Sequence, residues 1–119
     1  MRKLTEKRRT GDRGERRTAL YLILRGYRIL ERNYTVGHKE IDLIAKKGRV
    51  LAFIEVKTRN DTVNSSPASA VTVKKKRNII AAAGSYRASH DTSEMTIRYD
   101  VSEVPVRGKI NYIPNAFTE

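Results

Sequence analysis

Two stretches decide the fold of this chain: Glu40-Ile41-Asp42-Leu43-Ile44-Ala45 and Phe53-Ile54-Glu55-Val56-Lys57. Short runs this rich in Ile, Leu, Val and Phe are typical of buried strands. Side chains alternate between the faces of a strand, so the two charged residues of each stretch are expected to share a face. Charged groups on a covered face are costly unless they pair with an opposite charge or bind a metal ion. The two stretches therefore predict a sheet with a functional site on it.

The segment between the two stretches predicts a tight hairpin, with two alternatives for its loop. If the loop is Lys47-Gly48, Asp42 faces Phe53 and Glu55 is its diagonal neighbour. If the loop is Gly48-Arg49, with its glycine at the positive φ of a type II′ turn, Asp42 lies directly opposite Glu55. Both registers keep the four charged residues on one face, because only a slip by an odd number of residues separates them.

Opposed carboxylates on one face point to a metal site. Like charges that face each other destabilise a sheet by up to about 1 kcal/mol, and partial burial increases this cost. A divalent cation reverses the sign, because Mg²⁺ is bound by one or two carboxylates together with water and substrate phosphate. The alternative is a buried ion pair of Lys57 with Glu55 or with Asp42, although such pairs are seldom stabilising by themselves.

The rest of the sequence predicts a single α/β domain with the order helix, three strands, helix and two strands. A basic, flexible arm (1–10) precedes the domain (11–114), and a short tail (115–119) follows it. The expected helices are 11–24 and 72–89, the expected strands are 27–34, 39–46, 49–58, 96–106 and 109–113, and 59–69 is expected to be a loop.

The composition indicates a protein that meets a polyanion. The chain has 25 Lys and Arg against 13 Asp and Glu, a formal net charge of +12, and this excess favours nucleic acid as the partner. The absence of cysteine excludes disulfides and thiolate metal sites. The basic N-terminus lacks the apolar stretch of a signal peptide, and no segment is apolar enough to span a bilayer, so we expect a cytoplasmic protein without a membrane partner.

The spacing of Asp42 and Glu55-Val56-Lys57 resembles the PD-(D/E)xK signature of restriction-endonuclease-like nucleases, although the proline of that signature is absent. The surrounding motifs are similar to those of the YraN-type family. One position departs from the family pattern, because Lys39 stands where a Gly usually precedes the Glu-Ile-Asp run. The similar motifs are Gly14-Glu15, Ala19, Gly26-Tyr27, Asn33-Tyr34, the two stretches quoted above, Arg59, Pro67, Val71, Lys74, Ala82, Tyr86 and Arg98-Tyr99-Asp100-Val101.

This resemblance implies a restriction-endonuclease-like α/β core, a central mixed sheet flanked by helices in the order α-β-β-β-α-β-β. It also implies that Asp42, Glu55 and the carbonyl of Val56 bind Mg²⁺ or Mn²⁺, while Lys57 positions the attacking water. Archaeal-type Holliday junction resolvases, which are similar in motif layout, also carry an early helical Glu. Glu15 would play that part here, in contact with the metal directly or through water. Glu40 is expected near these ligands without being one of them.

Glu15 also has an ordinary explanation. It lies one turn before Ala19 on the apolar stripe that Leu22 and Ile23 continue, and a Glu in the first turn is favoured by the helix dipole. Its position on the apolar stripe favours the functional interpretation.

A set of basic residues is expected to bind the nucleic-acid backbone without reading sequence. Among them, Lys74 resembles the additional basic residue that many such nucleases place beside the scissile phosphate. The full set is Arg13, Arg16, Arg59, Lys74, Lys75, Lys76 and Arg77.

The predicted function is metal-dependent hydrolysis of phosphodiester bonds in structured or branched DNA. The alternative is a nucleic-acid-binding module that keeps the fold without catalysis. A third possibility, a basic structural protein of a ribonucleoprotein, would leave the charged strand face without a purpose. DNA is expected more than RNA. Many junction-cutting enzymes are dimers, so the resemblance also allows a homodimer.

Overall fold

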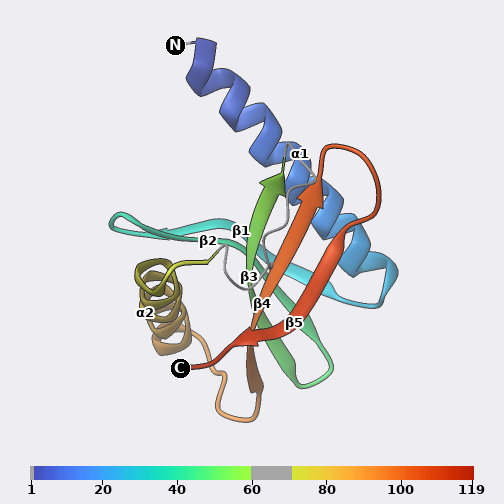
Figure 1. Ribbon diagram of the computed structural model, residues 1–119. Coiled ribbons are helices and arrows are strands. Elements are labelled where there is room, and N and C mark those ends of the chain that lie inside the picture. The colour runs from blue at the N-terminus through green and yellow to red at the C-terminus, as the bar shows by residue number, and fades with distance from the viewer. Residues whose placement is uncertain (1, 60–70) are drawn as a thin grey trace.

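The computed structural model describes residues 2–59 and 71–119, and side chains from residue 12 onward. The observed order is helix, three strands, helix and two strands, which confirms the predicted order (Figure 1). None of the described helices is long and apolar enough to cross a membrane. The elements are α1 (Arg2–Leu24), β1 (Arg28–Val36), β2 (Lys39–Lys47), β3 (Val50–Arg59), α2 (Val73–Ser89), β4 (Thr96–Pro105) and β5 (Asn111–Phe117).

Both ends of the chain differ from the predicted boundaries. Helix α1 begins at Arg2 rather than at residue 11, because the basic residues before Gly11 are good helix formers and this glycine does not interrupt them. Strand β5 continues to Phe117, where the apolar ring is buried against Tyr99 of β4, so the residues expected as a tail extend the sheet. The expected loop 59–69 falls largely within 60–70, which lie outside the described residues.

The sheet is mixed, with the strand order β1-β2-β3-β4-β5. Strands β3 and β4 are parallel, and all other neighbouring pairs are antiparallel. A parallel pair needs a long crossover connection, and the segment that contains α2 provides it.

The β2–β3 hairpin adopts the second of the two predicted loops. Lys47 pairs with Val50, which leaves Gly48-Arg49 as the loop. Of these two residues only Gly48 has a positive φ, 58°, as a type II′ turn requires. The same register, continued along the strands, sets Asp42 opposite Glu55.

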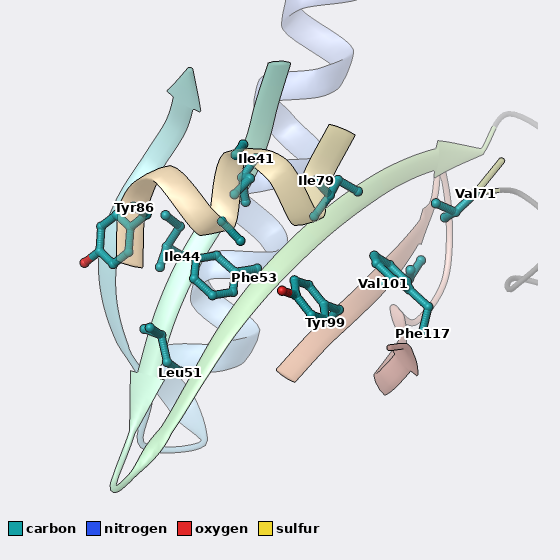
Figure 2. Packing of buried hydrophobic residues seen from close by; sticks show 12 residues of the cluster. Ile41, Ile44, Leu51, Phe53, Val71, Ile79, Tyr86, Tyr99, Val101 and Phe117 are labelled. Carbon is teal, nitrogen blue, oxygen red and sulfur yellow. The ribbon is translucent and has the colours of Figure 1, made fainter. Parts of the chain in front are cut away.

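The two helices cover opposite faces of the sheet, each over its own hydrophobic core. Leu43 and Ile54 pack with α1, whereas their neighbours Ile44 and Phe53 pack with α2, as strand alternation requires. We call these faces the α1 face and the α2 face. Figure 2 shows the apolar cluster of the α2 face, in which Ile79 and Tyr86 of α2 lie over the strands.

The apolar stripe predicted for α1 is only partly right. Ala19 and Leu22 are buried, but the side chain of Ile23 is 53% exposed. A helix advances by about 100° per residue, and the stripe in contact with the sheet is too narrow to include Ile23 beside Leu22.

Three sets of contacts hold helix α1 against the sheet, around Gly14, Arg17 and Thr18. Gly14 lies so close to β3 that a Cβ atom there would be 2.8 Å from Thr58 Oγ1. One turn later, the hydroxyls of Thr18 and Ser102 are 2.7 Å apart and buried. Arg17 donates hydrogen bonds to the carbonyls of Pro105 and Gly108. These contacts fix the part of α1 that carries Glu15.

The Arg98-Tyr99-Asp100-Val101 motif has a structural role. Asp100 is completely buried, and its carboxylate accepts hydrogen bonds from Arg98 Nε, Tyr112 Oη and the backbone N–H of Asn115. Arg98 also donates to Tyr27 Oη. A buried charge with its hydrogen-bond partners in place is tolerated, and this network joins β4 to β5 and to the start of β1.

Candidate metal and nucleic-acid site

The side chains of β1 and β2 change the sheet face to which they point at one level of the sheet. That level is Asn33 on β1 and Asp42 on β2. Ile41 packs in the core of the α2 face together with Ile44, whereas Leu43 packs on the α1 face. Strict alternation would put Ile41 on the same face as Leu43, so the strand changes facing at Asp42. On β1 the residue at this level is Asn33, whose φ of 52° is left-handed, a conformation that asparagine adopts more readily than most residues.

Because of this inversion, Asp42 points into the gap between β2 and β3. Its Oδ2 accepts a hydrogen bond of 2.8 Å from the backbone N–H of Val56. The regular β2–β3 ladder ends just before, at the pair Leu43 and Ile54, and in Figure 1 the β1–β2 hairpin bends away from β3 beyond this point. The N–H and C=O of a residue in an extended strand point to the same edge, so the carbonyl of Val56 also faces the gap.

Three carboxylates converge on this gap. Glu15 of α1, Glu40 and Asp42 each contribute an oxygen, and these oxygens lie within 4.8 Å of one another. The prediction that Glu40 lies on the same face as Glu55 and further from the site was wrong. The inversion at Asp42 turns Glu40 toward the α1 face, where it meets Glu15.

The donor set fits a divalent cation. Glu15 is 8% exposed, and its Oε1 has no hydrogen-bond partner within the described part of the chain. Carboxylate oxygens are the ligands that Mg²⁺ and Mn²⁺ prefer. A buried carboxylate oxygen without a partner is costly, and a cation would satisfy it.

The pKa values of the carboxylates reflect this crowding. Burial, assisted by the charge of Asp42, raises the pKa of Glu15 to about 7, although a hydrogen bond from Asn33 acts in the opposite direction. Burial and the adjacent Glu55 raise the pKa of Asp42, against the stabilising hydrogen bond from Val56. Burial and the charge of Asp42 also raise the pKa of Glu40. The charge of Lys75 acts in the opposite direction at both Asp42 and Glu40.

Glu55 is neutralised by a lysine of α2. Its carboxylate is 3% exposed, and its Oε2 lies 3.2 Å from Nζ of Lys75. Burial alone would lower the pKa of Lys75, but Glu55 raises it above its ordinary value. The alternative of an ion pair with Lys57 is not observed: Lys57, which lies on the same face as Glu55, takes part in none of the ion pairs between residues that the structure describes.

The lysine of α2 that lies next to the carboxylates is Lys75, whereas the role expected for Lys74 beside a scissile phosphate stays a prediction. Thr72 caps α2, and its Oγ1 accepts a hydrogen bond of 3.1 Å from the backbone N–H of Lys75, which fixes the first turn. Consecutive helical residues point about 100° apart, so Lys74 is exposed and directed elsewhere.

The remaining basic residues differ in their surroundings. Arg13, Arg16 and Arg77 are exposed and available to a partner. Nζ of Lys76 lies 5.7 Å from the centre of the Phe117 ring. Nε of Arg59 lies 2.8 Å from Oε2 of Glu103, so this guanidinium supports the ends of β3 and β4.

A comparison with protein families shows where the chain belongs. The profile of the uncharacterised protein family UPF0102 matches residues 14–104. The chain belongs to the UPF0102 family. This confirms the resemblance to YraN-type proteins. Among similar UPF0102 proteins, that of Chlorobium phaeobacteroides is 47% identical over 97 residues, which are 82% of this chain and 76% of the relative. That of Chlorobaculum parvum is 49% identical over 94 residues, 79% of this chain and 73% of the relative.

A solved structure shares the fold of this UPF0102 protein. It is Hjc, a Holliday junction resolvase from the archaeal hyperthermophile Archaeoglobus fulgidus, with a TM-score of 0.57 and 20% identity. The match covers 87% of this chain and 75% of Hjc. The restriction-endonuclease-like core predicted for the UPF0102 chain is thereby confirmed.

Sequence reasoning missed the role of Asn33 in the site of this UPF0102 protein, and it listed Lys75 only among the residues that bind the nucleic-acid backbone, not as the partner of Glu55. Asn33 falls within the strand expected over 27–34 and within the observed β1, but that expectation did not include the left-handed backbone by which it inverts the facing of the strand. An asparagine within an otherwise strand-like run was the available signal, since this residue is depleted in regular strands.

Proposed function

We propose that this protein is a divalent-metal-dependent endonuclease that hydrolyses phosphodiester bonds in structured or branched DNA in the cytoplasm. The observation that carries the proposal is the position of Asp42 opposite Glu55 where β2 and β3 separate. Glu55 is buried and Asp42 is partly buried, burial and the adjacent Glu55 raise the pKa of Asp42, and the strand edge beside them is open, which is typical of a site built to bind a cation rather than to stabilise a sheet.

The proposed ligands are the carboxylates of Asp42 and Glu55 and the carbonyl of Val56. A divalent cation held there would supply Lewis-acid chemistry, polarising the phosphate and lowering the pKa of a water ligand. The hydrogen bond from Val56 holds Asp42 in the gap, and Glu15 acts from α1 as a further acidic group. Lys75 must leave Glu55 when that carboxylate turns to a cation.

The lysines supply positive charge where the phosphate would lie. Lys57, two residues after Glu55 on the same face, is proposed to orient the attacking water and to offset the negative charge of the transition state. Lys75, which lies beside Glu55, is proposed to assist with its positive charge. The exposed basic residues of α1 and α2 would hold the flanking backbone.

The preference for branched DNA rests on the shared fold with a Holliday junction resolvase. A four-way junction is resolved by two symmetrical incisions, which need two active sites, so we propose that the protein acts on such DNA as a homodimer. The same incision chemistry operates on flaps and nicked duplexes, and these belong among the test substrates.

The test is cleavage by purified protein. We expect Mg²⁺ or Mn²⁺ to support cleavage of at least one of linear, nicked, flapped or four-way-junction DNA, and EDTA to abolish it. Glu55→Gln should eliminate the activity, whereas the matched surface change Glu94→Gln should leave it unchanged. Glu94 is exposed and lies outside the site.

Two results would contradict the proposal. Activity that survives in Glu55→Gln would identify a contaminating nuclease. Binding of DNA without cleavage of any substrate, in either metal and at any protein concentration tested, would support the non-catalytic binding module instead.

A further inference from the structure

We infer that Glu15, Glu40 and Asp42 form a second divalent-cation site, in which Glu40 is a direct ligand and Asp42 is shared with the site at Glu55. This inference rests on the proposed function, because Asp42 acts as a bridge only if it also contributes to the first site. The new element is Glu40, which the strand pattern alone would place away from the ligands.

The first observation is convergence from two elements. Glu15 comes from α1, Glu40 and Asp42 come from β2, and one oxygen from each lies within 4.8 Å of the others. Glu55 is not a member of this group, since its carboxylate is directed to Lys75. Asp42 therefore stands between two acidic positions, Glu15 with Glu40 on one side and Glu55 on the other.

The second observation is the unsatisfied oxygen of Glu15. This side chain is more than nine-tenths buried, and its Oε1 finds no hydrogen-bond partner in the described ranges. The helix cannot easily move it out, because Gly14 and Thr18 fix this part of α1 on β3 and β4. A fixed, buried, unsatisfied acceptor beside two further carboxylates fits a ligand position for a cation.

The third observation is charge. Within residues 12–59 and 71–119, none of the three carboxylates forms an ion pair with a basic side chain at 4 Å or less. The nearest cationic group, Lys75, is bound to Glu55. Lys75 acts on Asp42 and Glu40 without pairing with either, so in a chain with a net charge of +12 a cation from solution would complete a cluster that the described basic side chains leave without an ion pair.

The distances suit a small, hard cation. Ligand oxygens at about 2.1 Å from Mg²⁺ stand at most about 4.2 Å apart, on opposite sides of the ion. Neighbouring ligand oxygens of an octahedral ion stand about 3.0 Å apart, so oxygens now within 4.8 Å of one another need to close by up to about 1.8 Å. Glu40 is exposed and free to adjust its rotamer. Sharing Asp42 would place the two cations at the spacing of about 3.5–4 Å found in two-metal phosphodiesterases.

The experiment counts bound Mn²⁺ by electron paramagnetic resonance during a titration of the full-length protein. The wild type should bind two Mn²⁺ per chain, with spin coupling between them. Glu40→Gln should bind one and lose the coupling, and Glu55→Gln should also bind one. Glu94→Gln is the matched control and should bind two. Circular dichroism checks that each variant is folded, which is expected for Glu40→Gln because that side chain is exposed.

The inference would be overturned by a single Mn²⁺ per chain in the wild type, or by two Mn²⁺ per chain that Glu40→Gln retains. These outcomes leave the proposed function intact if DNA cleavage still depends on Glu55. Conversely, two coupled Mn²⁺ that depend on Glu40, in a protein that cleaves no DNA, would support the site and contradict the nuclease activity.

Discussion

The carboxylate of Asp42 and the backbone N–H of Val56 are joined by a hydrogen bond of 2.8 Å across the gap where β2 and β3 stop pairing. This bond takes the place of a backbone hydrogen bond between β2 and β3, and it leaves the two strands apart at this point. It leaves the carboxylate beside Glu15, Glu40 and Glu55, where burial and the adjacent Glu55 raise the pKa of Asp42 and Lys75 acts in the opposite direction. Several measurable properties depend on this relationship.

Asp42→Asn should remove stabilisation by metal. Millimolar Mn²⁺ or Mg²⁺ should raise the melting temperature of the wild type, because a ligand that binds the folded state alone stabilises it by mass action. Asparagine has the same shape and can still accept the hydrogen bond from Val56, so the variant should fold. Its melting temperature should be the same with and without metal. An unchanged melting temperature in the wild type would argue against a metal site at Asp42.

Lys75→Met should have two opposite effects. The free energy of unfolding without metal should fall by about 1–2 kcal/mol, because Glu55 loses its partner while it stays buried. The affinity for Mn²⁺, measured by calorimetry, should rise, because no lysine competes for Glu55. Lys74→Met, next to it but exposed, should change neither quantity. Equal effects of the two variants would show that Lys75 has no special role.

The metal-free protein should lose stability as the pH rises from about 4.5 to 7. The folded state holds a proton on Glu15 up to a pKa of about 7, whereas the unfolded state releases it near 4.5. The folded state therefore binds more protons in this window, and the stability falls through it, by at most about 3 kcal/mol for this group.

Urea unfolding at several pH values measures this effect. Glu15→Gln should flatten the profile in part, since Asp42 and Glu40, whose pKa values are also raised, act in the same direction. A profile that Glu15→Gln leaves unchanged would contradict the assignment of the raised pKa to Glu15.

Alanine at two helical glycines should have opposite effects. Gly14→Ala would bring a methyl group to 2.8 Å from Thr58 Oγ1 and 3.3 Å from Val56 Cγ1, so α1 must shift, at a cost of about 1–3 kcal/mol. The shift also moves Glu15, and Mn²⁺ affinity should fall. Gly84→Ala in α2 meets no atom within 4 Å and should stabilise the protein by about 0.5–1 kcal/mol. Chemical denaturation measures both, and equal effects would contradict the close approach of α1.

Different substitutions should affect nucleic-acid affinity and catalysis. Lys57→Ala should bind DNA almost as tightly as the wild type, because the proposed backbone contacts come from exposed residues of the helices. Arg77→Ala should weaken binding and reduce the slope of log K against log salt by roughly 1, the value for one lost phosphate contact. Fluorescence anisotropy at several salt concentrations measures both. Affinity that does not change with salt would contradict the polyanion interpretation.

Much of the fold was readable from the sequence, for reasons that are local. The β2–β3 hairpin followed from two apolar runs around a glycine, and the opposition of Asp42 and Glu55 followed from one of the two loops that this glycine permits. The element order and the family were also predictable, because each helix and strand carries its own periodicity. The pairing register of neighbouring strands then determines which of their residues lie opposite each other.

Only the tertiary structure decided the contacts that local periodicity does not describe. The left-handed backbone at Asn33 and the inversion at Asp42 turn Glu40 toward α1, against the simple alternation of a strand. The choice of Lys75 over Lys74 depends on how α2 is rotated on the sheet, which its whole buried face determines. Sequence therefore determined which charged groups share a sheet, and packing between distant elements determined which of them touch.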